Sequence, residues 1–428
     1  MSSTFAELGV PIAIVRSLAD RGITEPFPIQ QLTLPDGLAG RDVSGRAPTG
    51  SGKTLAFGIP LVVGCPDAAP LRPSRLVLVP TRELASQVCS ELRLLAGPDG
   101  PRVEAVFGGV SIGRQAQAVR RGAEIVVACP GRLADMISQR MVHLDRVDVV
   151  VLDEADRMAD MGFLPEVRRL LDRCPDDRRT ILFSATLDGD VDVLVQRYQH
   201  DPVRHELAVD EDDEPDVEHH FWTVERTDRV AVTASVVART GPTVVFCRTK
   251  HGADRVARQL ARSGVTAAPI HGDRSQSQRE RALEQFRSGQ VAALVATDVA
   301  ARGIHVDDVA AVVHFDPPAD PKDYVHRSGR TGRAGARGVV VTMVVPDVAP
   351  AVVALQRSLG LPTRSTSPDL SRLGSDDTVR LTSPPSNRAS RSAAKKESAA
   401  PTTGDGANGQ RPRRSGGSRG GRPGGNGG

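Results

Sequence analysis

Short runs of valine, isoleucine and leucine recur along the chain, and each is followed by a segment with helical patterning. A continuous apolar run of this length is typical of a strand buried on both faces. Its alternation with helical segments is typical of βαβ units in a parallel sheet. The pattern therefore predicts an α/β fold. The predicted strands lie within residues 75–80, 123–130, 147–156 and 180–186, and then within 243–249, 291–298, 310–316 and 338–345.

Two changes of composition divide the chain. The stretch VDEDDEPDVEHH (209–220) is acidic and contains proline, and we interpret it as an exposed linker. After about residue 361 the sequence turns to Ser, Pro, Thr, Gly and Arg, which cannot bury enough apolar surface to offset their ordering entropy, so we expect disorder. The predicted parts are a first domain over 1–207, a flexible linker over 208–217, a second domain over 218–360 and a disordered tail over 361–428.

The formal charge of +3 conceals an asymmetry. From residue 385 to the end, nine Lys or Arg stand against two Asp or Glu, a net of +7, so the rest of the chain carries about −4 (3 − 7). A basic tail interleaved with glycine is typical of an auxiliary nucleic-acid tether; a solubilising tail is the alternative. The tail has no aromatic residue for base stacking, so we expect its binding to be mainly electrostatic.

Several classes of protein are disfavoured. No apolar run approaches the roughly 18 residues of a membrane span, and MSSTFAELGV has no secretory pattern. The five cysteines are dispersed and form no CxxC pair, which argues against a disulfide framework and a structural zinc site. We expect a cytoplasmic protein without a membrane partner.

The stretch APTGSGKT (47–54) fits the P-loop pattern if alanine is allowed in place of the first glycine. Gly50, Ser51 and Gly52 would let backbone N–H groups converge on phosphate oxygens. Lys53 would reach the β- and γ-phosphates, and the Thr54 hydroxyl would ligate Mg²⁺. The stretch follows RDVSGR, a plausible strand, and precedes a helix-like run. The alternative is a glycine-rich turn.

VVVLDEAD delivers Asp153 and Glu154 to the carboxyl end of a buried strand, where ligand sites of α/β proteins form. Beside a P-loop, one carboxylate can hold Mg²⁺ through water, and the other can position or deprotonate an attacking water. An Asp-Glu pair alone is more often a solvated helix start, but its place after a hydrophobic strand favours the catalytic interpretation.

The second half of the chain has no GK[ST] motif and instead carries YVHRSGRTGR, with Arg327, Arg330 and Arg333 separated by glycines. Facing the first domain's nucleotide, such arginines could stabilise charge on a transferred phosphoryl group. The alternative is a basic surface loop. One site built from two domains would couple their closure to ATP.

With these motifs in this order, the chain resembles the DEAD-box RNA helicases of superfamily 2 over nearly all of residues 5–345. The resemblance implies two tandem RecA-like domains, ATP and Mg²⁺ as cofactors, and RNA bound across both domains with little sequence preference. It also implies ATP hydrolysis coupled to local strand separation or RNP remodelling. PFPIQ, with Phe5 seventeen residues before Gly22, resembles the family's adenine-reading Q motif.

The resemblance also implies a set of site residues. It assigns catalysis to Lys53, Asp153, Glu154, Arg330 and Arg333, and Mg²⁺ to Thr54 and Asp153, partly through water. It assigns ATP binding to Phe5, Gln30, Ala47, Pro48, Thr49, Gly50, Ser51, Gly52, Lys53, Thr54 and Gly303. It assigns RNA binding to Pro80, Thr81, Arg82, Gly108, Gly109, Pro130, Gly131, Arg132, Arg248, Gln276, Arg279, Thr297 and Arg302. It assigns coupling between hydrolysis, RNA and the two domains to Ser184, Thr186, His305 and His326.

Two positions depart from the family pattern. Cys129 stands where the family usually has threonine before PGR, which removes one strong hydroxyl donor. His305 stands where relatives carry an aspartate that approaches the nucleotide ribose. As a metal ligand it would lack a second ligand at zinc spacing, and a neutral imidazole could accept one ribose hydroxyl bond but not two. Our hypothesis is that closure around ATP is weakened here and not lost.

Three other functions compete. A DNA helicase or translocase of the same superfamily is disfavoured by the Q motif and by the spelling DEAD. An ATP-gated RNA clamp would carry almost the same motifs. A passive RNA-binding protein would need the ATP site to be vestigial. The sequence does not choose between ribosome assembly and RNA degradation as a source of partners.

Overall fold

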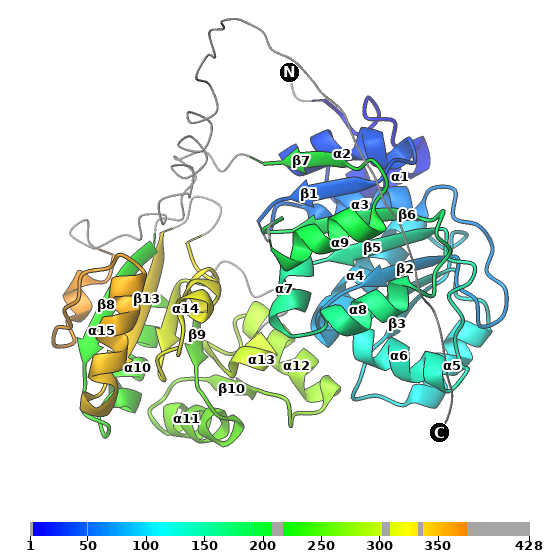
Figure 1. Cartoon of the computed structure of the whole chain (residues 1–428). Helices are drawn as coiled ribbons and strands as arrows, with labels where there is room; N and C mark the ends of the chain where they lie inside the picture. Colours follow the sequence, from blue (N-terminus) through cyan, green and yellow to red (C-terminus); the bar gives the residue numbers. More distant parts are fainter. Residues whose placement is uncertain are drawn as a thin grey trace, which may run out of the picture. The chain divides into compact units, whose positions relative to one another are not determined.

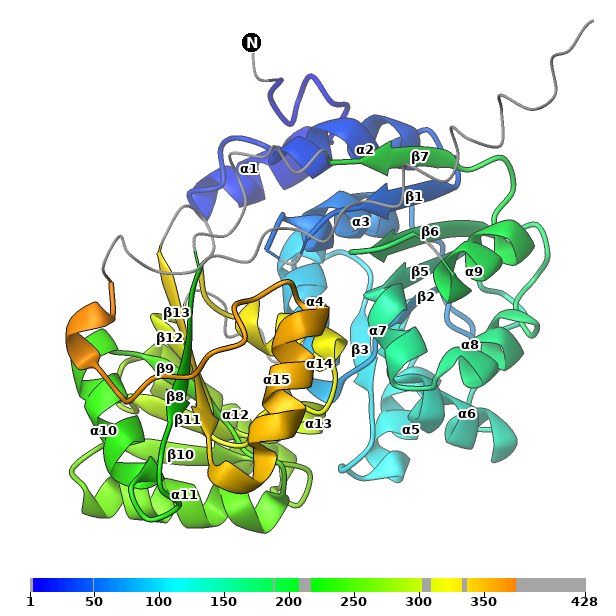
Figure 2. The same ribbon diagram turned by 60° about the vertical axis from the view of Figure 1, so that its left-hand side comes forward.

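The computed structural model describes residues 3–48, 50–187, 189–207, 217–301, 309–332 and 337–374, and these residues form two parallel sheets covered by helices (Figures 1 and 2). The predicted α/β fold is therefore confirmed. Among the described residues, no helix combines the length and the apolar character that crossing a bilayer requires.

The first sheet has seven parallel strands in the order β3-β4-β2-β5-β6-β1-β7. All four strands predicted in this half are present, and so is the strand suspected before the P-loop. The strands are β1 (Val43–Arg46), β2 (Arg75–Leu78), β3 (Val103–Val106), β4 (Ile125–Ala128), β5 (Val149–Asp153), β6 (Arg179–Ser184) and β7 (Val203–Glu206).

Helices cover both faces of this sheet because its strands are apolar on both faces. Val77 of β2 packs into the cluster formed with the first four helices, whereas its neighbours Leu76 and Leu78 pack into the cluster formed with the next five. The helices are α1 (Ile12–Asp20), α2 (Pro28–Leu38), α3 (Lys53–Val62), α4 (Arg82–Ala96), α5 (Ile112–Arg120), α6 (Pro130–Ser138), α7 (Ala155–Asp160), α8 (Leu164–Leu171) and α9 (Asp190–Tyr198).

The second sheet has six parallel strands in the order β10-β11-β9-β12-β13-β8, and the four strands predicted in this half are its four inner strands. Its strands are β8 (Val217–Thr223), β9 (Thr243–Phe246), β10 (Ala267–Ile270), β11 (Ala293–Ala296), β12 (Ala311–His314) and β13 (Gly338–Val344). Its helices are α10 (Arg229–Thr240), α11 (Lys250–Arg262), α12 (Gln276–Arg287), α13 (Asp298–Ala301), α14 (Pro321–Ser328) and α15 (Ala349–Ser358), with short 3-10 turns at Pro346–Val348 and Leu370–Arg372.

The structure corrects the end of the predicted linker. Residues 217–220, which we interpreted as exposed, belong to β8, and Glu218 is fully buried. The polar side chains of this strand are buried because each has a partner: Arg337 Nε lies 2.7 Å from a Glu218 carboxylate oxygen, and His219 Nδ1 lies 2.8 Å from the Tyr324 hydroxyl. Residues 208–216 lie outside the described residues.

The second domain also extends past residue 360, where we placed its end. Leu361 and Leu373 are each only 5 % exposed and pack into its two apolar clusters. Between them, Thr366 pairs with Trp222 of the edge strand β8. The composition of the segment hid this packing, because two separated leucines are enough to dock it. Residues 375–428 lie outside the described residues.

Candidate nucleotide and RNA site

The P-loop connects β1 to α3 at the carboxyl edge of the first sheet. Gly50 and Gly52 have φ angles of 87° and 85°, a conformation that favours glycine. A Cβ atom on Gly52 would lie 2.4 Å from Gln30 Nε2 and 2.5 Å from Phe27 Cδ2, so only glycine fits. Helix α3 begins at Lys53, directly after Gly52, so its N-terminus faces the loop, as an anion site at a helix N-terminus requires.

Lys53 is turned into its own loop. Its ammonium group donates to the carbonyl oxygens of Ala47 at 2.9 Å and Pro48 at 3.0 Å, and its side chain is buried. The Ser51 hydroxyl donates to the Pro48 carbonyl at 2.8 Å. These two carbonyl groups hold the Lys53 ammonium group beside the backbone of the P-loop. Thr54 follows in the first turn of α3 and is partly exposed.

Gln30 ties the PFPIQ segment to the P-loop. Its amide oxygen accepts the Phe27 N–H at 2.9 Å, and its amide nitrogen donates to the Gly52 carbonyl at 2.8 Å. Gln30 is fully buried, and Phe5 is 2 % exposed within the apolar core. The exposed aromatic ring beside Gly52 belongs to Phe27. Phe27 is part of PFPIQ, but the sequence did not assign it a role.

Asp153 and Glu154 lie at the end of β5, and both are buried. Glu154 has φ 53° and ψ 51°, the left-handed conformation that a residue with a side chain adopts only under local constraint. The Asp153 carboxylate accepts the Glu154 N–H at 3.0 Å. Arg157, one helical turn further on, forms an ion pair with Glu154, with 2.8 Å between Nη1 and Oε2. Sequence reasoning missed Arg157, although its spacing of three residues from Glu154 was a usable signal.

Ser184 connects the P-loop to the DEAD segment (153–156). It ends β6, which lies between β5 and β1. Its carbonyl accepts the Ala47 N–H at 3.1 Å, and its hydroxyl accepts the Asp156 N–H at 3.2 Å. The predicted coupling residue thus contacts the backbone of both the P-loop and the DEAD segment. Thr186, two residues further on, is exposed.

The structure brings together three motifs predicted to bind RNA. The guanidinium of Arg82 lies against the backbone of Gly108 and Gly109, where a Cβ on Gly109 would be 2.2 Å from Arg82 Nη1. Arg132 donates to the Val110 carbonyl at 3.0 Å and to the Gln115 amide oxygen at 2.8 Å. Pro80, Thr81, Pro130 and Gly131 flank these contacts at the starts of α4 and α6.

Cys129, the departure from the family pattern, precedes Pro130 in this region. Burial, together with the nearby carboxylate of Glu83, raises the pKa of its thiol to about 12 against the opposing effect of Arg82 and Arg132. The thiol therefore stays protonated near neutral pH and brings no negative charge to the surface that Arg82 and Arg132 form.

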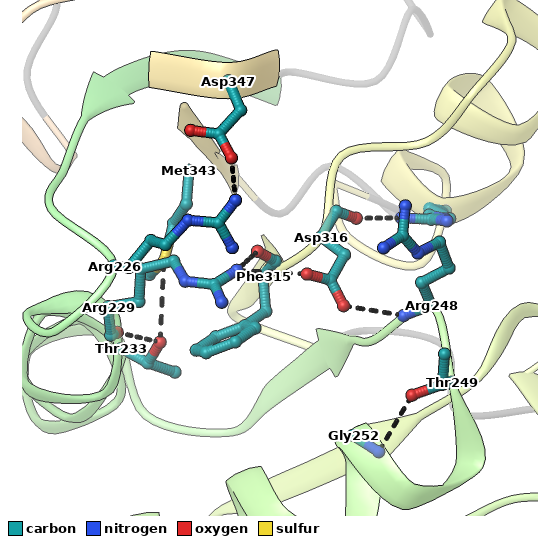
Figure 3. A network of polar contacts seen from close by, with 11 residues as sticks. Arg226, Arg229, Thr233, Arg248, Thr249, Gly252, Phe315, Asp316, Met343 and Asp347 are labelled. Carbon is teal, nitrogen blue, oxygen red and sulfur yellow. Dashed lines mark hydrogen bonds and ion pairs between the residues drawn. The ribbon is translucent and has the colours of Figure 1, made fainter. Parts of the chain in front are cut away.

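In the second domain, Asp316 is the centre of a polar network (Figure 3). Its carboxylate accepts the Arg248 N–H at 2.9 Å and pairs with Arg229 Nη1 at 3.1 Å. The Arg229 guanidinium also lies over the Phe315 ring, 4.1 Å from its centroid. The network fixes the backbone at Arg248, whose side chain is exposed, as an RNA-contacting residue requires.

The Arg327 side chain is engaged by groups of its own domain. Its guanidinium is bidentate to Asp298 at 2.6 and 2.8 Å and donates to the Asp316 carbonyl at 2.8 Å, and the residue is 5 % exposed. It therefore connects α14 to the strand end that carries Thr297, also buried. Arg330 is buried at the end of the same segment.

Two further predicted RNA contacts are buried. The Gln276 amide donates to Glu280 at 3.1 Å, and Arg279 Nη2 pairs with Glu83 Oε1 of PTRELA at 2.9 Å.

His326, predicted to couple the domains, has its Nδ1 4.0 Å from Asp160 Oδ2. Burial lowers the pKa of His326, and Asp160 opposes this shift. Five predicted site residues lie outside the described residues: Thr49, Arg302, Gly303, His305 and Arg333.

The donor set fits ATP and Mg²⁺. The P-loop cradle has no room for a Cβ at Gly52, and it presents the α3 N-terminus and a buried lysine to a phosphate. The Thr54 hydroxyl and the Asp153 carboxylate are hard oxygen ligands of the kind that Mg²⁺ prefers. These features define a two-domain α/β protein with a P-loop nucleotide site.

Comparisons with known proteins identify the family within this class. The family model described as DEAD/DEAH box helicase matches residues 27–194, and that described as helicase conserved C-terminal domain matches residues 226–335. The ATP-dependent RNA helicase CshA of Listeria monocytogenes is 41% identical over 80% of this chain and 66% of its own length. The DEAD-box ATP-dependent RNA helicase CshA of Bacillus subtilis is 38% identical over 81% of this chain and 70% of its own length.

Other relatives extend the comparison. DEAD-box ATP-dependent RNA helicase 30 of Arabidopsis thaliana is 41% identical over 80% of this chain, which spans 59% of that relative's length. Among solved structures, S. cerevisiae Dbp5 bound to RNA and ADP BeF3 matches with a TM-score of 0.70 and 26% identity, over 85% of this chain and 95% of that one. The chain belongs to the DEAD-box helicase family.

Proposed function

We propose that this chain is an ATP-dependent RNA helicase, which binds RNA across two RecA-like domains and couples ATP hydrolysis to local strand separation or RNP remodelling. The observation that carries the proposal is the contact of Ser184 with both the P-loop at Ala47 and the DEAD segment at Asp156. Its CshA relatives are named as ATP-dependent RNA helicases, which supports the same activity here.

In this proposal the residues of the first domain divide the work. Lys53 and the α3 N-terminus bind phosphate, while Thr54 and Asp153 hold Mg²⁺, which neutralises phosphate charge when bound. Glu154 accepts a proton from the attacking water at its carboxylate. Arg330 and Arg333 of the second domain stabilise the transferred phosphoryl group, and Gln30 with Phe5 contributes to adenine recognition.

RNA lies against Arg82, Gly108–Gly109 and Arg132 in the first domain, and against Arg248 and Thr297 in the second. These contacts go mainly to sugar and phosphate, so binding depends little on sequence. The basic tail is an auxiliary RNA tether, and the protein works in the cytoplasm, with ribosome-assembly or RNA-degradation factors as candidate partners.

The test is ATP turnover by the full chain, with and without single-stranded RNA, beside release of a short RNA duplex. We expect RNA to stimulate hydrolysis, and Glu154→Gln to abolish turnover while ATP and RNA binding persist. Undiminished hydrolysis by Glu154→Gln would remove that residue from the role of base. Long retention of RNA without duplex release would indicate a clamp, and faster release of a DNA duplex would indicate a DNA helicase.

A further inference from the structure

A hollow of about 380 Å³ lies next to the surface that Arg82, the Gly108–Gly109 turn and Arg132 form. Its walls come from α4, from the edge strand β3 and from the start of α5. Ser86, one turn beyond Arg82 on α4, lies on one wall, and Val110 and Ser111, directly after Gly109, lie on another. The hollow therefore begins where the predicted RNA contacts of the first domain end.

The walls of the hollow are held in place by side chains that form hydrogen bonds and an ion pair with β3 and the residue after it. Arg93 donates to the Val103 carbonyl at 2.9 Å and pairs with Glu104 at 3.2 Å, which neutralises the one carboxylate among the lining residues. Gln115 donates to the carbonyls of Ala105 and Phe107, at 3.3 and 3.2 Å. These contacts cover the carbonyl groups of the sheet edge, as a stable edge strand requires.

Other polar groups of the hollow have no role in holding it together. Within the described part of the chain, the guanidinium of Arg114 makes no hydrogen bond or ion pair, and its side chain is exposed. In the same part, the hydroxyls of Ser86 and Ser111 are also unengaged, and Ser111 does not cap α5 with its side chain. The hollow thus offers one free positive charge and two hydroxyl groups, which is the donor set that phosphate contacts use.

We propose that this hollow is an additional RNA subsite, in which Arg114, Ser86 and Ser111 bind the backbone phosphate of a nucleotide beyond those on the Arg82 and Arg132 surface. The inference rests on the proposed function, because it extends the same RNA path. Arg132 connects the two parts physically, since it holds the Val110 carbonyl at the rim of the hollow. A peptide strand added to β3 is less favoured, because Gln115 and Arg93 already occupy edge carbonyls.

The experiment compares Arg114→Ala with Arg120→Ala in the full chain. Arg120 lies on the same helix, is exposed and does not line the hollow, so its replacement removes the same charge elsewhere. Fluorescence anisotropy would measure binding of oligouridylates of about 6 and about 12 nucleotides, with a non-hydrolysable ATP analogue, over a range of salt concentrations.

We expect Arg114→Ala to weaken binding of the longer RNA roughly fivefold and to reduce its salt slope by about 0.7, the loss of one phosphate contact. Binding of the shorter RNA should not change, and Arg120→Ala should match the unaltered chain on both. Arg114→Glu should give a larger loss on the longer RNA only. Equal effects of the Arg114 and Arg120 variants, or equal loss on both RNAs, would overturn the subsite. Failure of the unaltered chain to bind either RNA would instead overturn the proposed function.

Discussion

Arg157 and Glu154 form a partly buried ion pair within one helical turn, with 2.8 Å between Arg157 Nη1 and Glu154 Oε2. The pair occupies one carboxylate oxygen of the residue that we propose as the base. It also fixes the side chain of a residue whose backbone is left-handed, at φ 53°. Arg157 is therefore placed to hold the direction in which the Glu154 carboxylate points.

Replacing Arg157 tests this positioning role. We expect Arg157→Ala to lower kcat for RNA-stimulated ATP hydrolysis about tenfold, the effect of roughly 1.4 kcal/mol, because a charge-assisted bond that orients the carboxylate is lost. KM for ATP should change little. Arg157→Lys should recover much of the rate. A higher RNA-free rate in Arg157→Ala would mean that the pair restrains Glu154 instead of positioning it.

The second domain should lose stability in mild acid because of His219. Burial, together with a smaller effect of the charge of the neighbouring His220, lowers the pKa of His219 to about 3. The unfolded state, with a pKa near 6.5, binds a proton as the pH falls below that value, whereas the folded state does not until about pH 3. Stability from this group is therefore complete above about pH 6.5 and declines as the pH falls, by about 2 kcal/mol between pH 7 and pH 5.

Trp222 provides the measurement, since it is the only tryptophan of the chain and is buried on the same strand as His219. Urea unfolding followed by its fluorescence should show a smaller loss between pH 7 and pH 5 in His219→Gln than in the unaltered chain. His251→Gln, at an exposed position, is the control. The prediction is wrong if all three proteins lose the same stability over this range.

Two truncations test where the second domain ends. Ending the chain after residue 360 removes the buried Leu361 and Leu373 and the Gly374 N–H that Glu218 accepts at 3.0 Å. We expect a loss of about 3 kcal/mol in the unfolding reported by Trp222, since each buried leucine contributes about 1.5–3 kcal/mol. Ending the chain after residue 374 should leave that unfolding unchanged.

The second truncation also tests the proposed tether. Removing residues 375–428 should weaken RNA binding mainly at low salt and leave ATP binding intact, because the basic residues of the tail act through charge. RNA affinity that is the same with and without these residues at every ionic strength would contradict a tethering role.

His305 lies outside the described residues, so its role stays a prediction from the sequence. We expect His305→Asp to lower the ATP concentration needed for half-maximal RNA-stimulated hydrolysis, because a carboxylate can accept two hydroxyl bonds where a neutral imidazole accepts one. Steady-state ATPase assays measure this directly. An unchanged or higher requirement would show that the histidine is neutral or has a function of its own.

The inner strands of both sheets could be predicted from the sequence, but the edge strands could not. Eight of the nine inner strands were recognised from their apolar runs, and β1 from its place before the P-loop, whereas the four edge strands β3, β7, β8 and β10 were not recognised. Edge strands have one open side and carry polar residues or proline, as in VRHE of β7 and AAPI of β10, so the apolar signal fades. The buried Glu218 of β8 shows the extreme case, in which partners distant in sequence make a polar strand stable.

The site was predictable at the level of motifs but not of contacts. The glycines of the P-loop and the strand that ends in Asp153 follow from local rules of conformation and burial. The hydrogen bonds of Arg327 with Asp298 and Asp316 do not follow from such rules, because three arginines separated by glycines look equivalent in the sequence. Nor could the sequence reveal that the Gln30 amide bonds the Gly52 carbonyl, because that pairing depends on a turn of the backbone 22 residues away.

Ser184 has a consequence for how the first domain tolerates distortion. Because one residue bonds the backbone of Ala47 on one side and of Asp156 on the other, both segments are located from a common point. We expect a twist of the sheet to move the ends of β1, β5 and β6 together, so that the spacing between Lys53 and Glu154 changes little.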